Sequence, residues 1–211
     1  MMSDKSAMDE HSLPARISKE EINRLPIVRF GGKIQVIREP DGLRTAAKKL
    51  RSTKVVGFDV ESKPTFRKGE SHPVALLQLV SAKEAFLIQL RPLKDLGPIS
   101  EILEDPSIEK VGVAIRDDIK KLAEKHPFQP ENFVELGISA TKLGIVTTGL
   151  RSLTAILLKK RISKGAQLSN WERRNLAPAQ LSYAATDAWI SRELHLVMQR
   201  HLRKLEQNDS V

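Results

Sequence analysis

The stretch KVVGFDVES, residues 54–62, decides the fold. It is an apolar run typical of a buried strand, and it ends in two carboxylates, Asp59 and Glu61. Residues two apart on a strand point to the same side of the sheet. Because like charges in a partly buried site raise the free energy of the folded state unless something neutralises them, this strand end requires a positively charged partner.

Further apolar runs on both sides of this strand predict a mixed sheet. Residues 33–39 (KIQVIRE) are typical of a short edge strand. The runs at 74–82 (VALLQLVSA) and 84–90 (EAFLIQL) are separated by a short break, which indicates a hairpin. Residues 110–115 (KVGVAI) are one more compact strand candidate. The sheet therefore takes its strands from the first and middle thirds of the chain.

Segments with helical spacing of apolar residues lie between these strands and after them. They cover 41–52, the segment from Pro98 to 106, 116–126, 135–144, 149–161 and 176–207, where Pro178 suits a first helical turn. The order of elements predicts an α/β fold with helices on both faces of the sheet and a helical C-terminal third. A single domain is expected over residues 26–205. The polar residues 1–25 predict a flexible N-terminal arm, and 206–211 a short polar tail.

Composition limits the kinds of partner and chemistry. The 211 residues include 35 Lys and Arg against 26 Asp and Glu, a formal net charge of +9. This excess favours polyanions such as nucleic acid, although a solvated basic surface would also explain it. The absence of cysteine excludes disulfides, thiolate zinc sites and thiol catalysis. No apolar run approaches the roughly 20 residues of a membrane span and no signal peptide is evident, so a cytoplasmic protein is expected.

Two more segments carry acidic residues in unusual places. Asp117 and Asp118 open the helix after the strand at 110–115, where helix capping would account for either one. Tyr183 and Asp187 lie four residues apart and hence on one helix face. That face continues into apolar residues, so Asp187 points partly inward, where a contact to a neighbouring loop is the alternative explanation.

Carboxylates from three segments, with no cysteine to compete, are the ligand set that Mg²⁺ or Mn²⁺ prefers. Two such ions about 4 Å apart would neutralise the clustered charge and favour in-line phosphoryl displacement. The sequence therefore predicts a site for two divalent cations, and the basic surface would hold an anionic substrate.

Three stretches in order, FDVES, VGVAIRDDIKKL and LSNWERRNLAPAQLSYAATDAW, resemble the three motifs of the DnaQ-like 3′–5′ exonucleases. They are most similar to the ribonuclease D and Werner-type exonuclease group, and the resemblance covers roughly residues 30–205. It implies a ribonuclease H-like fold. It also implies hydrolysis of the terminal phosphodiester at a 3′ end of DNA or RNA, releasing nucleoside 5′-monophosphates.

The resemblance assigns five side chains to the catalytic site: Asp59, Glu61, Asp118, Tyr183 and Asp187. The four carboxylates correspond to metal ligands, with Asp59 bridging both ions. Tyr183 corresponds to the tyrosine that defines the DEDDy subclass and would orient the attacking water. In the second motif the pattern places Asp118 on the ligand and Asp117 beside it, and a shared role for Asp117 stays open.

Six further residues are candidate nucleic-acid contacts: Arg67, Lys68, Lys160, Arg161, Lys164 and Trp171. The basic ones could equally form a solvated surface, and Trp171 could pack beneath the site instead. A different hypothesis is a non-catalytic nucleic-acid-binding module, but all four carboxylates and the tyrosine are present, which favours the enzyme. A basic peripheral membrane protein is disfavoured, and oligomeric state and the choice between DNA and RNA stay open.

Overall fold

The computed structural model describes residues 13–67 and 69–208. They form a six-stranded mixed sheet with the strand order β1-β4-β3-β2-β5-β6. The strands are β1 (Lys33–Ile37), β2 (Val55–Ser62), β3 (Val74–Val80), β4 (Glu84–Gln89), β5 (Glu109–Gly112) and β6 (Phe133–Glu135). Only β3 runs antiparallel to its neighbours. The expected hairpin and the expected edge strand at 33–37 are both confirmed.

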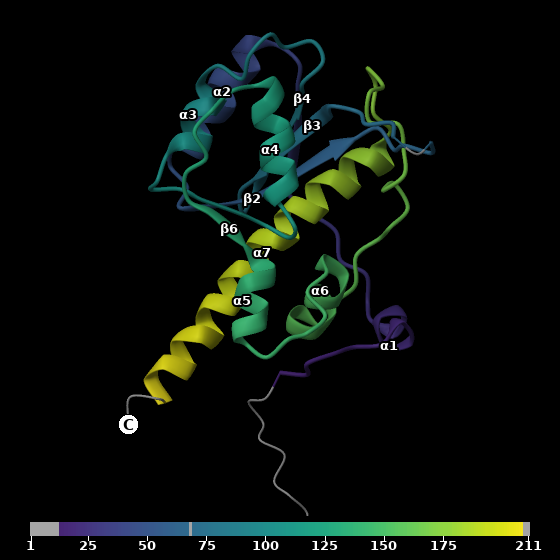
Figure 1. Ribbon diagram of the computed structural model, residues 1–211, viewed down its shortest axis with the longest axis vertical. Coiled ribbons are helices and arrows are strands. Elements are labelled where there is room, and N and C mark those ends of the chain that lie inside the picture. Colours follow the sequence, from purple (N-terminus) through teal and green to yellow (C-terminus); the bar gives the residue numbers. More distant parts are fainter. Residues whose placement is uncertain (1–12, 68, 209–211) are drawn as a thin grey trace, which may run out of the picture.

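Helices cover both faces of this sheet, as the sequence predicts (Figure 1). They are α1 (Lys19–Arg24), α2 (Pro40–Leu50), α3 (Pro98–Glu104), α4 (Arg116–Lys125), α5 (Leu136–Lys142), α6 (Leu150–Leu158) and α7 (Pro178–Asn208). Helices α2, α3 and α4 cover one face, and the long α7 crosses the other with α5 and α6 beside it. The expected mixed α/β architecture is confirmed.

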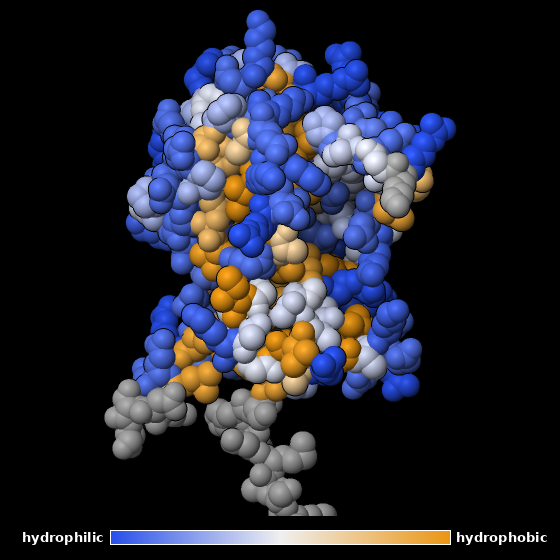
Figure 2. All heavy atoms as spheres, viewed as in Figure 1, coloured by the Kyte–Doolittle hydropathy of each residue, from blue (hydrophilic) through white to orange (hydrophobic). Residues whose placement is uncertain are grey.

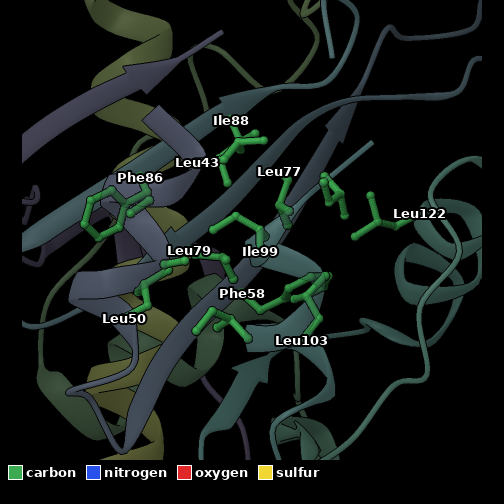
Figure 3. Close-up of a cluster of buried hydrophobic side chains, with 14 of the residues drawn as sticks. Leu43, Leu50, Phe58, Leu77, Leu79, Phe86, Ile88, Ile99, Leu103 and Leu122 are labelled. Carbon is green, nitrogen blue, oxygen red and sulfur yellow. The ribbon is translucent and has the colours of Figure 1, made fainter. Parts of the chain in front are cut away.

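The face under α2, α3 and α4 carries the larger apolar core (Figure 3). Every residue of β3 is buried, which explains its unbroken run of apolar side chains around one glutamine. Phe58 of β2 and Leu77 of β3 point into this core and are fully buried. Because its alternate residues are fixed in this core, β2 presents the residues between them to α7.

The face under α7 is packed through small side chains. Ala184, Ala185 and Ala188 are fully buried against the sheet. Small residues let a helix backbone approach a strand closely, so α7 lies near enough to β2 to place its polar side chains beside the end of that strand. Pro178 begins the helix, as expected from its fixed φ angle.

The N-terminal segment differs from the expectation of a flexible arm. Residues 1–12 lie outside the described part, but residues 13–25 are folded against the domain. Ser18 and Glu21 form a reciprocal capping box at the start of α1, and Ile22 is buried. The N–H of Val146 donates to the carbonyl of Ala15 at 2.8 Å. The prediction was wrong for this segment because a single helical turn carries too few apolar residues to show a period.

The C-terminal third is less helical than expected. The helix expected over 149–161 ends at Leu158, because Lys159 takes a left-handed conformation (φ 52°), and residues 159–177 form no helix. The strand predicted over 110–115 stops at Gly112, and Ala114 also has a positive φ, of 59°. Strand β6 was not predicted; its three residues are all half-buried and show no alternation. The short tail expected at 206–211 instead continues α7 as far as Asn208.

Figure 2 shows that hydrophilic side chains cover most of the upper half of one face, where Figure 1 places α2, α3 and α4. Hydrophobic residues are more frequent on the lower half, near α5 and α6. Among the described residues, no helix combines the length and the apolar character that a membrane crossing requires.

Candidate active site

Strand β2 fixes two carboxylates on the α7 side of the sheet. Phe58 and Val60 pack toward the core on the other face, so Asp59 and Glu61 point toward α7. Both carboxylates are half-buried, and Oδ1 of Asp59 accepts the N–H of Val60 at 2.9 Å. The strand is central in the sheet, with β3 on one side and β5 on the other. It therefore provides a rigid support for the pair.

Helix α4 brings a third carboxylate to the same place. Asp118 is half-buried and its negative charge raises the pKa of Asp59, whereas Asp117 is exposed. The start of this helix is fixed by Glu135, which accepts the N–H groups of Ala114 and Ile115, each at 2.9 Å. This geometry supports the alignment that assigns the ligand role to Asp118.

Helix α7 contributes the remaining two groups. Tyr183 and Asp187 lie one turn apart, and a hydrogen-bond interaction with the Tyr183 hydroxyl lowers the pKa of Asp187 against the larger effect of burial. Asp187 is 7 % exposed, and its Oδ1 has no hydrogen-bond partner in the described part of the chain. The side chain is therefore a buried carboxylate with one oxygen still available to a ligand.

All four carboxylates of the cluster have pKa values above their ordinary range. Burial, followed by the charges of Asp59, Asp187 and Asp118, raises the pKa of Glu61 to about 10. Burial raises the pKa of Asp187 to about 7 and that of Asp118 to about 6. Burial, followed by the charges of Asp187 and Asp118, also raises the pKa of Asp59 well above its usual range. The charges of Asp118 and Asp187 act on both Asp59 and Glu61, so the fold brings the four carboxylates near one another.

Oxygen-only ligands of this kind suit a hard divalent cation. The unpartnered Oδ1 of Asp187 and the mutual repulsion of the carboxylates fit such an ion. The amide of Gln78, which lies opposite Asp59 in the β2–β3 pairing, is fully buried and also has no partner within the described residues. Among those residues, no three acidic or histidine side chains are already arranged to hold an ion.

The cluster opens into a cleft formed by three adjoining cavities, all of which include Tyr183 and Asp187. The cavity of about 210 Å³ contains the β2 carboxylates. A second, of about 340 Å³, reaches Lys19 of α1 and Arg151 of α6. The third, of about 290 Å³, reaches Arg29. Basic side chains thus line the cleft beside an acidic centre, which suits a polyanionic substrate cut at one bond.

The basic residues expected to contact nucleic acid are placed differently from one another. Lys164 lines the 340 Å³ cavity next to Tyr183 and Asp187. Lys160 is exposed and lines none of the three cavities. Arg161 donates through Nε to the carbonyl of Leu25 at 2.9 Å, so this group holds the N-terminal segment in place. Of these three residues, Lys164 is the one that the fold brings directly to the site.

Two predicted contacts lie near the loop after β2. Arg67 is exposed, and Lys68 lies outside the described residues. The remaining one, Trp171, is completely buried, and its ring lies 6.0 Å from that of Tyr183. A direct stacking contact between Trp171 and a base is therefore contradicted, because no face of the indole is exposed. Packing beneath Tyr183, the alternative considered for this residue, agrees with the structure.

Several cleft residues were missed from the sequence: Lys19, Arg29, Arg151, Gln167 and, as the support of α4, Glu135. The spacing Ser18–Glu21 is a capping-box signature that could have revealed α1 and, with it, Lys19. No local signal identifies the others, because they reach the site only through the packing of distant segments.

Comparison with known proteins gives a consistent result. A family model described as 3′–5′ exonuclease matches residues 34–203. The chain is 31% identical over 199 residues to the bifunctional 3′–5′ exonuclease/ATP-dependent helicase WRN of Mus musculus, covering 90% of this chain and 14% of that protein. It is 31% identical over 198 residues to a 3′–5′ exonuclease of Arabidopsis thaliana, covering 86% and 69%. The chain therefore spans a small part of the mouse protein and about two thirds of the plant protein.

Among solved structures, ribonuclease D of Escherichia coli superposes with a TM-score of 0.71 at 24% identity. The match covers 80% of this chain and 46% of that one. At this level of identity the likeness concerns the fold. The two chains share the fold described above over the part that superposes.

Proposed function

The chain belongs to the 3′–5′ exonuclease family, and from this premise we propose that it removes nucleotides one at a time from the 3′ end of DNA or RNA and releases nucleoside 5′-monophosphates. The observation that carries the proposal is the gathering of Asp59, Glu61, Asp118 and Asp187 with Tyr183 at the end of β2. Nuclease activity follows from the family. The reaction details, the DEDDy subclass and a cytoplasmic location are parts of the proposal.

We assign the four carboxylates to two divalent cations, Mg²⁺ or Mn²⁺, which Asp59, Glu61, Asp118 and Asp187 would hold. When bound, such ions supply Lewis-acid stabilisation of the attacking and leaving oxygens. The carboxylates of this chain bind and orient them, and the central strand keeps Asp59 and Glu61 in a fixed position. The protein's own share of the chemistry is therefore mainly positioning and charge.

Tyr183 acts as a positioning group for the attacking water. Burial, followed by the charges of Asp187 and Glu61, raises the pKa of its hydroxyl above the ordinary value. A phenol with a raised pKa stays protonated at physiological pH and cannot serve as a general base. Its hydroxyl can still accept and donate hydrogen bonds, so it can orient a water molecule toward the scissile phosphate.

The substrate is proposed to be a 3′ end of single-stranded or recessed DNA or RNA. The solved ribonuclease D of E. coli is described as an exoribonuclease involved in structured RNA processing, and that of Trypanosoma brucei was determined with RNA U12. These descriptions apply to those proteins. For this chain, the basic side chains around the acidic centre, Lys19, Arg29, Arg151 and Lys164, support a polyanionic strand in the cleft.

The proposal is tested with oligonucleotides labelled at the 5′ end and incubated with Mg²⁺ or Mn²⁺. A ladder that shortens from the 3′ end is expected, and EDTA or Asp59→Ala should abolish it. Asp41→Ala, an exposed carboxylate on α2, is the matched control and should leave the ladder unchanged. Binding of the oligonucleotide without shortening would identify a non-catalytic binding module. Full degradation by Asp59→Ala would contradict the metal assignment.

A further inference from the structure

A further cavity, of about 480 Å³, lies beside the C-terminal end of β4. Four arginines line it: Arg38, Arg91, Arg173 and Arg174. Glu39 and Glu172 are the acidic residues of its lining, so positive charge is in excess. Ala75 and Pro92 add apolar surface. We call this cavity the arginine pocket; its lining combines cations for a phosphate with apolar area for a base.

A hydrogen-bond network fixes the arginine pocket before any ligand arrives. Gln89, which is 5 % exposed, donates through Nε2 to the carbonyl of Arg173 at 2.8 Å. Arg38 donates to the carbonyl of Arg174 at 2.6 Å and, through Nε, to Oε1 of Gln89. The main chain of residues 173–174 is therefore tied to the sheet. Preorganisation of this kind reduces the entropy that a ligand must give up on binding.

The charged groups of the pocket are free to meet an anion. Within the described residues, the side chains of Arg91, Arg173 and Arg174 enter no ion pair, and all three are exposed.

The arginine pocket adjoins the catalytic carboxylates. Glu61, Leu76 and Gln89 lie in one row across β2, β3 and β4. Two strand spacings separate the ends of that row, a distance of about 10 Å. Trp171, which lines the pocket, also packs against the Tyr183 ring. A strand with its terminal phosphodiester at the carboxylates could therefore place a neighbouring nucleotide in the arginine pocket.

The hollow continues beyond the space that one nucleotide needs. An adjoining cavity of about 300 Å³ shares Ala75, Arg91 and Glu172 with the arginine pocket and extends to Lys125 at the end of α4. Positive side chains thus follow a path along the sheet edge. This extended shape fits successive nucleotides of a strand better than a single free nucleotide.

We propose that the arginine pocket binds nucleotides of the substrate strand on the 5′ side of the scissile bond, with arginine side chains on phosphates and the apolar wall against a base. The proposal rests on the proposed function, since it takes the 3′ end of that strand to lie at the carboxylates. Two contacts to single-stranded phosphates contribute about 1.4 to the slope of log K against log salt concentration.

The test measures binding in EDTA, so that hydrolysis plays no part. The double variant Arg91→Ala/Arg174→Ala is compared with wild type by fluorescence anisotropy of a labelled eight-nucleotide single strand across a salt series. Both residues are exposed and unpaired, so folding should be unaffected. The matched control is Lys48→Ala/Arg203→Ala, which removes two exposed charges from α2 and from α7 away from the pocket.

We expect roughly tenfold weaker binding by the Arg91/Arg174 variant at moderate salt and a salt slope smaller by about 1.4, with little change in the control. The affinity for a free nucleoside 5′-monophosphate should not change. Equal effects of the two double variants would overturn the proposal. So would loss of monophosphate binding alone, which would indicate a product site, or an equal loss of binding to a poly-aspartate peptide, which would indicate a general anion site.

Strand binding and the 3′ ladder together distinguish failure of the pocket assignment from failure of the catalytic proposal. If wild-type protein binds the strand through the arginine pocket but gives no 3′ ladder with metal, the catalytic proposal fails and the pocket assignment stands. If it gives the ladder while the arginine variant binds as wild type does, the pocket assignment fails alone. Wild-type protein that binds no strand at all contradicts both.

Discussion

Gly57 of β2 and Ala188 of α7 approach so closely that a Cβ on Gly57 would lie 1.7 Å from the main-chain oxygen of Ala188. No side chain fits between the strand and the helix at this point. Asp59 lies two residues after Gly57, and Asp187 directly precedes Ala188. The contact therefore sets the separation between the carboxylates of the strand and the carboxylate of the helix.

Gly57→Ala should damage both stability and catalysis. Overpacking of a core costs about 1–3 kcal/mol and sometimes more, and here the clash is with backbone, which cannot rotate away. We expect the upper end of that range in urea unfolding, together with a loss of exonuclease rate in the protein that remains folded. Gly31→Ala, where an added Cβ meets nothing within 4 Å, is the control. Wild-type stability in Gly57→Ala would show that α7 is free to move away.

The two aspartates of α4 should differ in their effect on activity. Asp118 is half-buried and coupled to Asp59, whereas Asp117 is exposed. Asp118→Asn should reduce the rate by on the order of 100-fold or more, because it removes a ligand charge. Asp117→Asn should change it by less than about threefold. Single-turnover rates of the two variants, measured with saturating Mg²⁺, test this difference. A severe loss of rate in Asp117→Asn alone would mean that the motif is aligned one residue too late.

Tyr183→Phe should lower kcat with little change in KM. The substitution keeps the ring that packs on Trp171 and removes only the hydroxyl, so the melting temperature should stay close to that of wild type. Because the pKa of this hydroxyl is raised, the pH–rate profile of the wild type should contain no basic ionisation that disappears in the variant. Disappearance of such an ionisation would assign general-base catalysis to Tyr183 after all.

The metal-free protein should lose stability as pH rises through the pKa values of the site. In the folded state the pKa of Asp187 is about 7 and that of Asp118 about 6, against an ordinary value of 3.8. Their contribution to stability is thus fully present below about pH 4 and is lost as pH rises to about 7. Mg²⁺ should therefore raise the melting temperature more at pH 8 than at pH 5.

Scanning calorimetry in EDTA from pH 4 to 8 measures this effect. Asp187→Asn removes one of the titrating groups, so its melting temperature should decline less with pH than that of wild type. Identical pH dependence in the two proteins would show that Asp187 is not a titrating group of the folded state.

The sequence was sufficient wherever the signal is local. The apolar run ending in Asp59 and Glu61 identified β2 and placed both carboxylates on one side of the sheet, and the break around residues 82–83 identified the β3–β4 hairpin. The spacing of Tyr183 and Asp187 placed both on one side of α7. These features depend on strand and helix periodicity, which neighbouring residues alone determine.

What the sequence could not supply depends on contacts between distant segments. Strand β6 is three residues long, too short for a period, yet its Glu135 holds the turn before α4. The role of Arg161 in binding the carbonyl of Leu25 depends on a pairing across 136 residues. The arginine pocket likewise joins the end of β1, the end of β4 and residues 171–174, and no spacing rule links those positions.

The contact between β2 and α7 has a consequence during synthesis of the protein. Asp59 and Asp187 are 128 positions apart in the sequence, so a growing chain carries the first two ligands long before the last. While the chain is still being translated, the proposed catalytic centre therefore stays incomplete until α7 has emerged and packed against Gly57.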